Sequence, residues 1–314
     1  CKEISGGFDM SGDIKNMAAS VRQQLYNIAK KENINFDLIL LLFMQERLLY
    51  RLSISQYNFK FILKGGLLIL SKTDIKKRPT RDIDFLGQNV SNDIKEIKNI
   101  IKKISQIHVN DGVVYDPESI KVEKITEGAD YEGLRIKINS FLGNAKKRLQ
   151  IDIGFGDVIV PKMKEITYPG LLDFDYPKLK SYSYESVIAE KFEIMLRLSL
   201  INSRMKDFYD IYLLSIVETF DGRILQEAIF STFEKRGVPL KKDQKLFTDD
   251  FSENKEKIKQ WNAYLNKIGQ EIISFKEVMK RIKTFLLPIY EYIIDEKEFF
   301  RKWDCDKGEW IKYN

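Results

Sequence analysis

The chain contains few of the residues that build disulfide-linked or zinc-held scaffolds. Its 314 residues include two cysteines, Cys1 and Cys305, and one histidine, His108. Two cysteines at opposite ends of the chain exclude a disulfide-rich scaffold and a cysteine-based zinc site. A single histidine excludes every metal or catalytic site that needs two histidines. No nucleophile motif stands near His108, so we interpret it as a surface or strand-entry residue.

Long apolar runs are also missing. The longest extends from Leu38 to Met44 and ends at Gln45, well short of the roughly 20 residues that a membrane-spanning helix needs. The first residues, CKEISGGFD, show no basic start followed by an apolar stretch, as a secretory signal would. We therefore expect a cytoplasmic protein without a membrane partner.

The charge balance excludes a protein that coats nucleic acid by charge alone. Lysine and arginine number 52 against 46 aspartates and glutamates, which gives a net charge of +6. This mild excess is compatible with a nucleic-acid or nucleotide partner and establishes neither. Apolar residues make up 44% of the chain, so it can bury a sizeable core and is not a disordered protein.

The first part of the chain mixes helical and strand patterns. Apolar residues at helical spacing predict helices over residues 13–52, the second beginning after Asn35, and again over residues 91–107. Strands are predicted at FKFIL, at TRDIDFLG, in the stretch 113–138 and, after a turn at GNAKKR, at LQIDIGFGD.

The later part of the chain is almost entirely helical in pattern. Helices are predicted at SYESVIAEKFEIMLRL, RMKDFYDIYLLSIVE and RILQEAIFSTFEKR, and in two long amphipathic segments from about residue 253 to 293. We predict an α+β protein with two domains, a mixed domain over residues 1–179 and an α-helical domain over residues 180–314.

Two carboxylates stand two residues apart in the predicted strand TRDIDFLG. Side chains alternate between the faces of a strand, so Asp82 and Asp84 project to one side while Ile83 and Phe85 enter the core. Like charges on one face repel each other, and a divalent cation between them removes that repulsion.

A third carboxylate lies in LQIDIGF. Leu149, Ile151 and Ile153 share one face, so Asp152 points to the other, and a hairpin would bring it onto the sheet that carries Asp82 and Asp84. Three carboxylates on adjacent strands are typical of a Mg²⁺ site for phosphoryl chemistry. For any one of them alone, a solvent-facing strand residue is the simpler interpretation.

Lys64, Gly65 and Gly66 separate a predicted strand from an apolar helix start. Glycines there allow backbone N–H groups to approach an anion, which the start of a helix also favours. A glycine pair by itself is usually a tight turn. The order strand, Gly-Gly, helix, Asp-x-Asp strand is more specific.

One lysine of the later part faces inward in its predicted helix. On a helical wheel of residues 183–198, Lys191 falls inside the apolar arc, while Glu190, Glu193 and Arg197 fall on the opposite side. An inward lysine needs an anion unless it snorkels along the edge of the apolar stripe.

Two aspartates stand three residues apart in RMKDFYDIYLL. Asp207 and Asp210 are therefore neighbours on one helix face, where Arg204 and Lys206 can pair with them. From the residues alone, a salt-bridged helix surface is the simpler interpretation.

These motifs carry a resemblance at two levels. Gly65-Gly66, Asp82-x-Asp84 and Asp152 together resemble the DNA polymerase β-type nucleotidyltransferase superfamily. Four ordered segments, FILKGGLLIL, RPTRDIDF, YESVIAEKFEIMLRL and RMKDFYD, resemble the AbiEii/AbiGii toxin family. Its members are nucleotidyltransferase-like toxins of abortive-infection and toxin–antitoxin systems and include the MenT enzymes. The resemblance runs from about residue 40 to 290.

The resemblance implies a fold, a reaction and partners. The fold would be a nucleotidyltransferase-type mixed sheet with flanking helices, followed by a C-terminal helical bundle that closes the cleft. The enzyme would use Mg²⁺ or Mn²⁺ to transfer a nucleotide from a nucleoside triphosphate to RNA, with the 3′ end of tRNA as acceptor. Translation would stop, as in phage defence. A cognate antitoxin, often a DNA-binding repressor, would be its partner.

The resemblance also assigns roles to residues. The catalytic set would be Asp82, Asp84, Asp152, Lys191, Asp207 and Asp210. The metal ligands would be Asp82, Asp84 and Asp152, although Asp152 could instead be the base that activates the acceptor hydroxyl. The nucleotide would be bound by Lys64, Gly65, Gly66, Arg78, Thr80, Lys191 and Arg204. Of Asp207 and Asp210, Asp207 is our first choice for the essential family aspartate.

Three alternatives stay open at this point. The same fold could move the γ-phosphate and act as a kinase. A catalytically silent member could bind nucleotide or RNA and act through contacts alone, although such a protein has no need for clustered carboxylates. A nucleotidyltransferase that modifies a small molecule is a weaker alternative, because the later helical motifs do not suit it.

Overall fold

The structure is a computed structural model that describes residues 10–73, 78–127 and 131–313, so Cys1 lies outside the described residues. The chain divides into two compact units built from alternating segments. The first unit holds Cys1–Leu63, Thr80–Phe155 and Glu165–Lys180, and the second holds Lys64–Pro79, Gly156–Lys164 and Ser181–Asn314. The division at residues 179/180 stays a prediction. No helix within the described ranges has the length and apolar character to cross a membrane.

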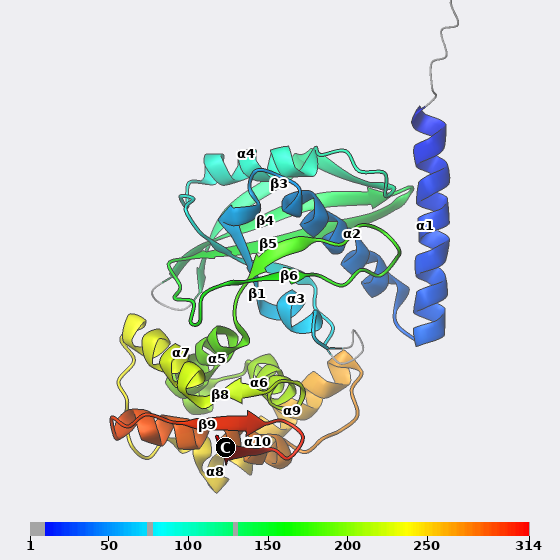
Figure 1. Ribbon diagram of the computed structural model, residues 1–314. Helices are drawn as coiled ribbons and strands as arrows, with labels where there is room; N and C mark the ends of the chain where they lie inside the picture. Colours follow the sequence, from blue (N-terminus) through cyan, green and yellow to red (C-terminus); the bar gives the residue numbers. More distant parts are fainter. Residues whose placement is uncertain (1–9, 74–77, 128–130, 314) are drawn as a thin grey trace, which may run out of the picture. The chain divides into compact units, whose positions relative to one another are not determined.

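A mixed sheet forms the centre of the first unit (Figure 1). Its described strands are β1 (Phe61–Lys64), β2 (Asp82–Gly87), β3 (Val113–Glu127), β4 (Tyr131–Leu142), β5 (Ala145–Phe155), β6 (Lys164–Thr167) and β7 (Lys178–Ser181). They lie in the order β3-β4-β5-β2-β1-β7-β6. β4 is antiparallel to β3 and β5, whereas β2 and β5 are parallel. The predicted mixed sheet is confirmed.

The faces of β2 follow the predicted alternation. Ile83 is fully buried and Phe85 nearly so, whereas Asp82 and Asp84 are half-buried. Alternation of this kind is expected where one face of a strand packs on a core. The polar face of β2 is therefore held in place by Ile83, between the two carboxylates, and by Phe85, after them.

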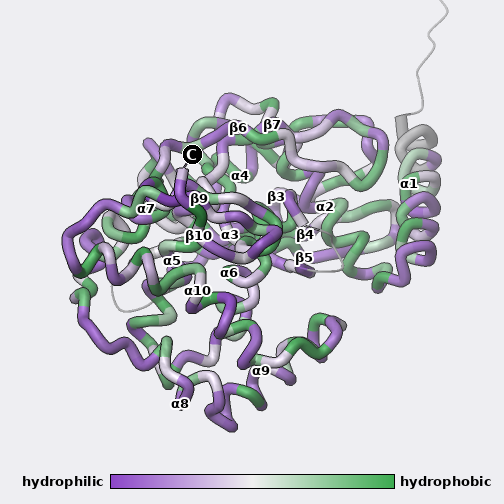
Figure 2. Tube along the Cα trace, turned by 60° about the horizontal axis from the view of Figure 1, so that its bottom comes forward, coloured by the Kyte–Doolittle hydropathy of each residue, from purple (hydrophilic) through white to green (hydrophobic). Residues whose placement is uncertain are grey.

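Helices cover the apolar residues of this sheet. The described ones are α1 (Met10–Glu32), α2 (Phe36–Ser53), the short 3-10 turn Asn58–Lys60 and α4 (Ile94–Ser105). α2 lies against β5, α4 lies against β3, and the two helices touch each other. α2 begins after Asn35, as predicted, and Asn35 caps it by accepting from the backbone N–H of Asp37 and Leu38. In Figure 2 the trace of α2 is largely green, whereas purple segments recur along α1.

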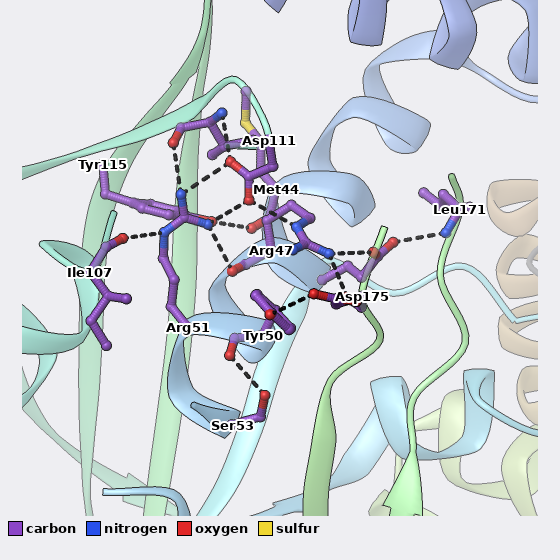
Figure 3. A network of polar contacts seen from close by, with 12 residues as sticks. Met44, Arg47, Tyr50, Arg51, Ser53, Ile107, Asp111, Tyr115, Leu171 and Asp175 are labelled. Carbon is purple, nitrogen blue, oxygen red and sulfur yellow. Dashed lines mark hydrogen bonds and ion pairs between the residues drawn. The ribbon is translucent and has the colours of Figure 1, made fainter. Parts of the chain in front are cut away.

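Buried charges join α2 to two loops of the first unit (Figure 3). Asp111, which precedes β3, accepts from Arg47 Nε at 2.8 Å and from Arg51 Nη1 at 2.7 Å. The neighbouring Glu46 accepts from the backbone N–H of Leu171 at 2.8 Å. Burial raises the pKa of Glu46 to about 7, against the opposing effects of that hydrogen bond and of Arg47. The cluster fixes the C-terminal half of α2 against chain segments far apart in sequence.

The second unit is mainly helical, with a small sheet. Its described helices are α3 (Gly65–Leu70), α5 (Tyr184–Leu198), α6 (Met205–Val217), α7 (Gly222–Lys235), α8 (Asp249–Ser252), α9 (Lys255–Ile268) and α10 (Phe275–Ile294), with 3-10 turns at Ser199–Ile201 and Lys245–Phe247. α5 packs on α6 and α7, and α10 packs on the same two helices. The C-terminal helical bundle is thus confirmed.

Three short strands in this unit differ from the almost wholly helical prediction. β8 (Phe220–Asp221), β9 (Arg301–Asp304) and β10 (Glu309–Lys312) form a sheet in the order β10-β9-β8. Each of the last two carries one buried tryptophan, Trp303 or Trp310, among polar residues. Strands this short have no repeating pattern, so the sequence could not indicate them.

Candidate active site

The three predicted strand carboxylates lie on adjacent parallel strands. Asp84 of β2 pairs in register with Asp152 of β5, and Asp82 pairs with Gln150. Register partners on neighbouring strands project from the same face. The structure therefore brings Asp82, Asp84 and Asp152 onto one polar face of the sheet, as the sequence predicted.

Asp152 is held by an arginine that the sequence reasoning missed. Arg135, its register partner on β4, donates from Nε to Oδ1 at 2.9 Å and from Nη2 to Oδ2 at 2.8 Å. Gln150 also donates to Oδ2, at 3.1 Å. Hydrogen bonding to Asp152, then the charges of Asp152 and Asp82, raise the pKa of Arg135. The sequence contained part of the signal, because Arg135 stands between the buried Leu134 and Ile136 and so takes the polar face of its strand. The register of β4 with β5 is what places it opposite Asp152.

Two of the three strand carboxylates have the donor chemistry that a divalent cation needs. Asp82 and Asp84 offer carboxylate oxygens on one strand face, which are the ligands that Mg²⁺ prefers. Asp152 gives both oxygens to Arg135. Within the described ranges, no group of three or more histidine, cysteine, aspartate or glutamate side chains is arranged to hold a metal ion. Asp82 and Asp84 fit such an ion, whereas both oxygens of Asp152 already accept hydrogen bonds from Arg135.

The Gly-Gly turn joins β1 directly to α3, as predicted. Gly65 begins the helix with φ +66, a conformation that favours glycine. The preceding Lys64, a predicted nucleotide ligand, is largely buried, and its Nζ lies 2.6 Å from Asp157 Oδ2 and 3.3 Å from Glu190 Oε2. Burial would lower the pKa of Lys64, but Glu190 and then Asp157 raise it well above its usual value. Lys64 here completes an ion-pair network beside the turn.

This network corrects the predicted polar face of α5. Glu193 was expected on the side opposite the apolar arc but is fully buried. It accepts from Arg197 Nε and from Arg236 Nη1, each at 2.6 Å. Arg236 also lies 3.6 Å from Asp157. Arg236, which directly follows α7, makes this burial possible, and the helical wheel of α5 does not show it.

Lys191 faces inward and meets two carboxylates. Its Nζ lies 2.8 Å from Asp207 Oδ1 and 2.8 Å from Asp210 Oδ2 on α6. Both aspartates are fully buried, so the surface interpretation of this pair was wrong. Burial would lower the pKa of Lys191, but Asp207 and Asp210 outweigh it and raise that pKa.

Two arginines complete this cluster. Arg78 binds Asp210 through Nε and, at 3.1 Å, through Nη2, and Arg204 Nε donates to Asp207 at 2.6 Å. Burial would raise the pKa of Asp210, but Arg78 and then Lys191 lower it to about 2. Three cations thus face two carboxylates among these five groups. We call Arg78, Lys191, Arg204, Asp207 and Asp210 the α5–α6 charge cluster.

The predicted site residues therefore fall into three sets. Asp82, Asp84 and Asp152 share a sheet face in the first unit, where Thr80 is also buried. The α5–α6 charge cluster lies in the second unit, and Lys64 belongs to the separate network with Asp157, Glu190 and Arg236. Lys206 is exposed and has no part in the cluster. His108 is likewise exposed, as predicted.

A mixed sheet with Asp-x-Asp on one strand and a third aspartate in register on the next has the architecture of a nucleotidyltransferase. The family model described as "Nucleotidyl transferase AbiEii toxin, Type IV TA system" matches residues 47–281. The chain belongs to this family of nucleotidyltransferase toxins from type IV toxin–antitoxin systems, which confirms the resemblance. Membership implies a cognate antitoxin.

Two solved structures are similar to the chain at low identity. One is JHP933 from Helicobacter pylori, with 12% identity and a TM-score of 0.47 over 83% of this chain and 94% of that one. The other is described as a candidate nucleotidyltransferase from H. pylori, with 12% identity and a TM-score of 0.47 over 82% of this chain and 96% of that one. No curated protein matches the chain.

Proposed function

We propose that this chain transfers a nucleotide from a nucleoside triphosphate to the 3′ end of a tRNA and thereby blocks translation, as a toxin used in phage defence. The register of Asp84 with Asp152, with Asp82 on the same face, is the observation that carries this proposal. Clustered strand carboxylates suit phosphate chemistry, because metal-held oxygens are its usual means of neutralising charge.

The reaction forms one bond and breaks one. The acceptor hydroxyl oxygen attacks the α-phosphorus, the bond between the α-phosphorus and the bridging oxygen breaks, and pyrophosphate leaves. Asp82 and Asp84 would hold Mg²⁺ or Mn²⁺, which when bound neutralises charge on the phosphate oxygens. Asp152 takes the acceptor proton or becomes a further ligand, and in either role its oxygens are shared with or released by Arg135.

Residues of the second unit are assigned to the triphosphate. Lys191 binds a phosphate oxygen, and Arg78 and Arg204 add positive charge to the same cluster, in which cations exceed carboxylates. Asp207 and Asp210 position these cations. The backbone N–H groups of Gly65 and Gly66 are neutral phosphate contacts, and the hydroxyl of Thr80, a residue of the first unit, is another.

A labelling assay tests the proposal. The protein is incubated with total tRNA, Mg²⁺ and each nucleoside triphosphate labelled at the α- or γ-phosphate. Asp82→Asn removes a proposed ligand at constant shape, and Asp173→Asn, at an exposed aspartate of the first unit, is the matched control. We expect α-label from one nucleotide to enter tRNA with wild type and with Asp173→Asn, and a loss of about 100-fold or more with Asp82→Asn.

Other outcomes reassign the reaction. Entry of γ-label alone would make the protein a kinase. Binding of nucleotide without entry of either label would contradict transfer to tRNA. Transfer at equal rates by Asp82→Asn and Asp173→Asn would remove Asp82 from the site.

For partners, we propose that the cognate antitoxin is a DNA-binding repressor.

A further inference from the structure

A pocket of about 370 Å³ opens beside Asp82 within the first unit. Its volume is in the range of small-ligand pockets, roughly 300–1,000 Å³. The wall includes Asp82 and its register partner Gln150. Leu38 and Leu41, at the start of α2, are half-buried and give another side an apolar surface. The pocket is therefore continuous with the carboxylate face.

Basic side chains dominate the polar lining. The cations are Arg81, Lys137, Lys147 and Arg148, and the carboxylates are Asp37 and Asp82. Lys147 Nζ lies 2.6 Å from Asp37, and Lys137 Nζ lies 2.6 Å from Glu123. Arg148 has a neutral partner, since its Nε donates to the Asn139 side chain at 3.4 Å. The lining thus carries more positive than negative charge, which favours an anionic ligand.

One face of β5 carries both side chains of the pocket and one of the strand carboxylates. Arg148, Gln150 and Asp152 alternate with the buried Leu149 and Ile151 and so share one strand face. Four residues of strand extend on the order of 13 Å. An anion at Arg148 therefore lies on the carboxylate face, displaced along β5 from Asp152 and on the Asp82 side of that face.

The chemistry of the pocket suits one part of a nucleic acid. Cations suit a phosphodiester, and the apolar wall at Leu38 and Leu41 suits a sugar or a base. The basic run continues outward from the pocket to the exposed Lys146, which suits a ligand that extends beyond the pocket. The phosphodiester backbone of a nucleic acid extends beyond a pocket in this way, whereas the triphosphate of a single nucleotide does not.

We propose that this pocket binds the phosphate backbone of the acceptor RNA, upstream of the hydroxyl that reacts. The inference rests on the proposed function and adds the surface that holds the acceptor. Arg148 and Arg81 contact phosphates, and Leu38 and Leu41 contact the attached nucleotide. The contacts are independent of sequence, so they position the RNA and leave the choice of RNA to other residues.

Binding of labelled tRNA to the full chain, without nucleoside triphosphate, tests this assignment across a range of salt concentrations. The variants are Arg148→Glu and Arg81→Glu, both at exposed side chains. Lys95→Glu, at an exposed residue of α4 in the same unit, is the matched control for charge. We expect each pocket variant to weaken tRNA binding about tenfold and to reduce the salt slope by about 0.7 to 1. Lys95→Glu stays within about twofold of wild type.

A second arm measures the affinity for a fluorescent nucleoside triphosphate, which we expect to be the same in all four proteins. If Arg148→Glu lowers this affinity and leaves tRNA binding intact, the pocket belongs to the triphosphate and the inference is wrong. Equal tRNA binding by the pocket variants and Lys95→Glu would also overturn it.

The two proposals fail in different ways. If the wild-type protein labels tRNA but the pocket variants bind tRNA normally, the proposed function stands and the assignment of the pocket to the RNA backbone is wrong. If the wild-type protein labels no RNA but the pocket variants bind tRNA weakly, nucleotidyl transfer is refuted and the pocket remains a site for RNA phosphates.

Discussion

At the scale of single residues, burial separates two kinds of aspartate. Asp82 is half-buried on a strand face, whereas Asp210 is fully buried between Arg78 and Lys191. Replacing Asp210 with asparagine leaves these buried cations with one carboxylate fewer. We expect Asp210→Asn to lower the free energy of unfolding by about 3–5 kcal/mol and Asp82→Asn to change it by less than about 1 kcal/mol. Urea unfolding followed by tryptophan fluorescence measures the first effect.

The comparison also separates stability from catalysis. If Asp210→Asn unfolds at the wild-type urea concentration yet transfers no nucleotide, Asp210 acts on the substrate and its structural role is refuted. Asp82→Asn, measured by circular dichroism because it lies in the first unit, is the control that should lose transfer and keep stability.

Ionisation of Glu46 makes the free energy of unfolding depend on pH. Its folded-state pKa is raised from 4.5 to about 7, so the folded protein binds the proton more tightly than the unfolded chain does. Its stability contribution is fully present below pH 4.5 and is lost as pH rises toward 7, a change of about 3 kcal/mol. Glu46→Gln still accepts from the Leu171 N–H and does not ionise. We expect this variant to be more stable than wild type at pH 8, with a flatter profile between pH 5 and 7.

Far-UV circular dichroism in urea at four pH values follows this change. Glu118→Gln is the matched control, because Glu118 is strongly exposed. A wild-type profile that parallels that of Glu46→Gln would show that Glu46 ionises normally in the folded protein.

At the scale of elements, Arg47 connects α2 to the segment that precedes β7. Its Nη1 donates to the Asp175 carbonyl at 3.0 Å, and its guanidinium lies 5.1 Å from the Phe174 ring centroid. In Arg47→Met both contacts are lost, while Asp111 keeps Arg51 as a partner. We expect faster amide hydrogen exchange at residues 171–175, about tenfold or more, because that segment opens more readily.

The matched control is Arg22→Met, at an exposed arginine of α1. It also removes one positive charge and should leave amide hydrogen exchange at residues 171–175 unchanged. Equal exchange in the two variants would show that other contacts hold the segment.

Elements with a repeating pattern could be predicted from the sequence. The alternation around Ile83 and around Ile151 indicated which face of each strand carries the aspartates, and the register confirms it. The helical wheel likewise placed Lys191 inward. These features follow from short-range periodicity, which a single segment contains.

Other features depend on partners distant in sequence. Glu193 is buried because Arg236, directly after α7, reaches it, and Asp152 is held because β4 brings Arg135 opposite it. The pocket beside Asp82 combines the start of α2 with β2, β4 and β5. No local pattern contains such pairings, so the sequence indicated the carboxylates but neither their counter-ions nor the basic pocket.

At the scale of the whole molecule, we propose that the two units unfold as separate cooperative steps. Each has its own buried core, and all three tryptophans, Trp261, Trp303 and Trp310, are buried in the second unit. Tryptophan fluorescence therefore reports the second unit, whereas far-UV circular dichroism reports both. This difference makes the two transitions separable in one titration.

Asp111→Asn tests this separation from the first unit. Asp111 is fully buried between Arg47 and Arg51, so its neutralisation should destabilise that unit by about 3 kcal/mol or more. We expect part of the circular dichroism change to move to lower urea while the fluorescence midpoint stays in place. If the fluorescence midpoint moves by the same amount, the molecule unfolds as a single cooperative body, because loss of one buried carboxylate in the first unit is then felt at tryptophans of the second.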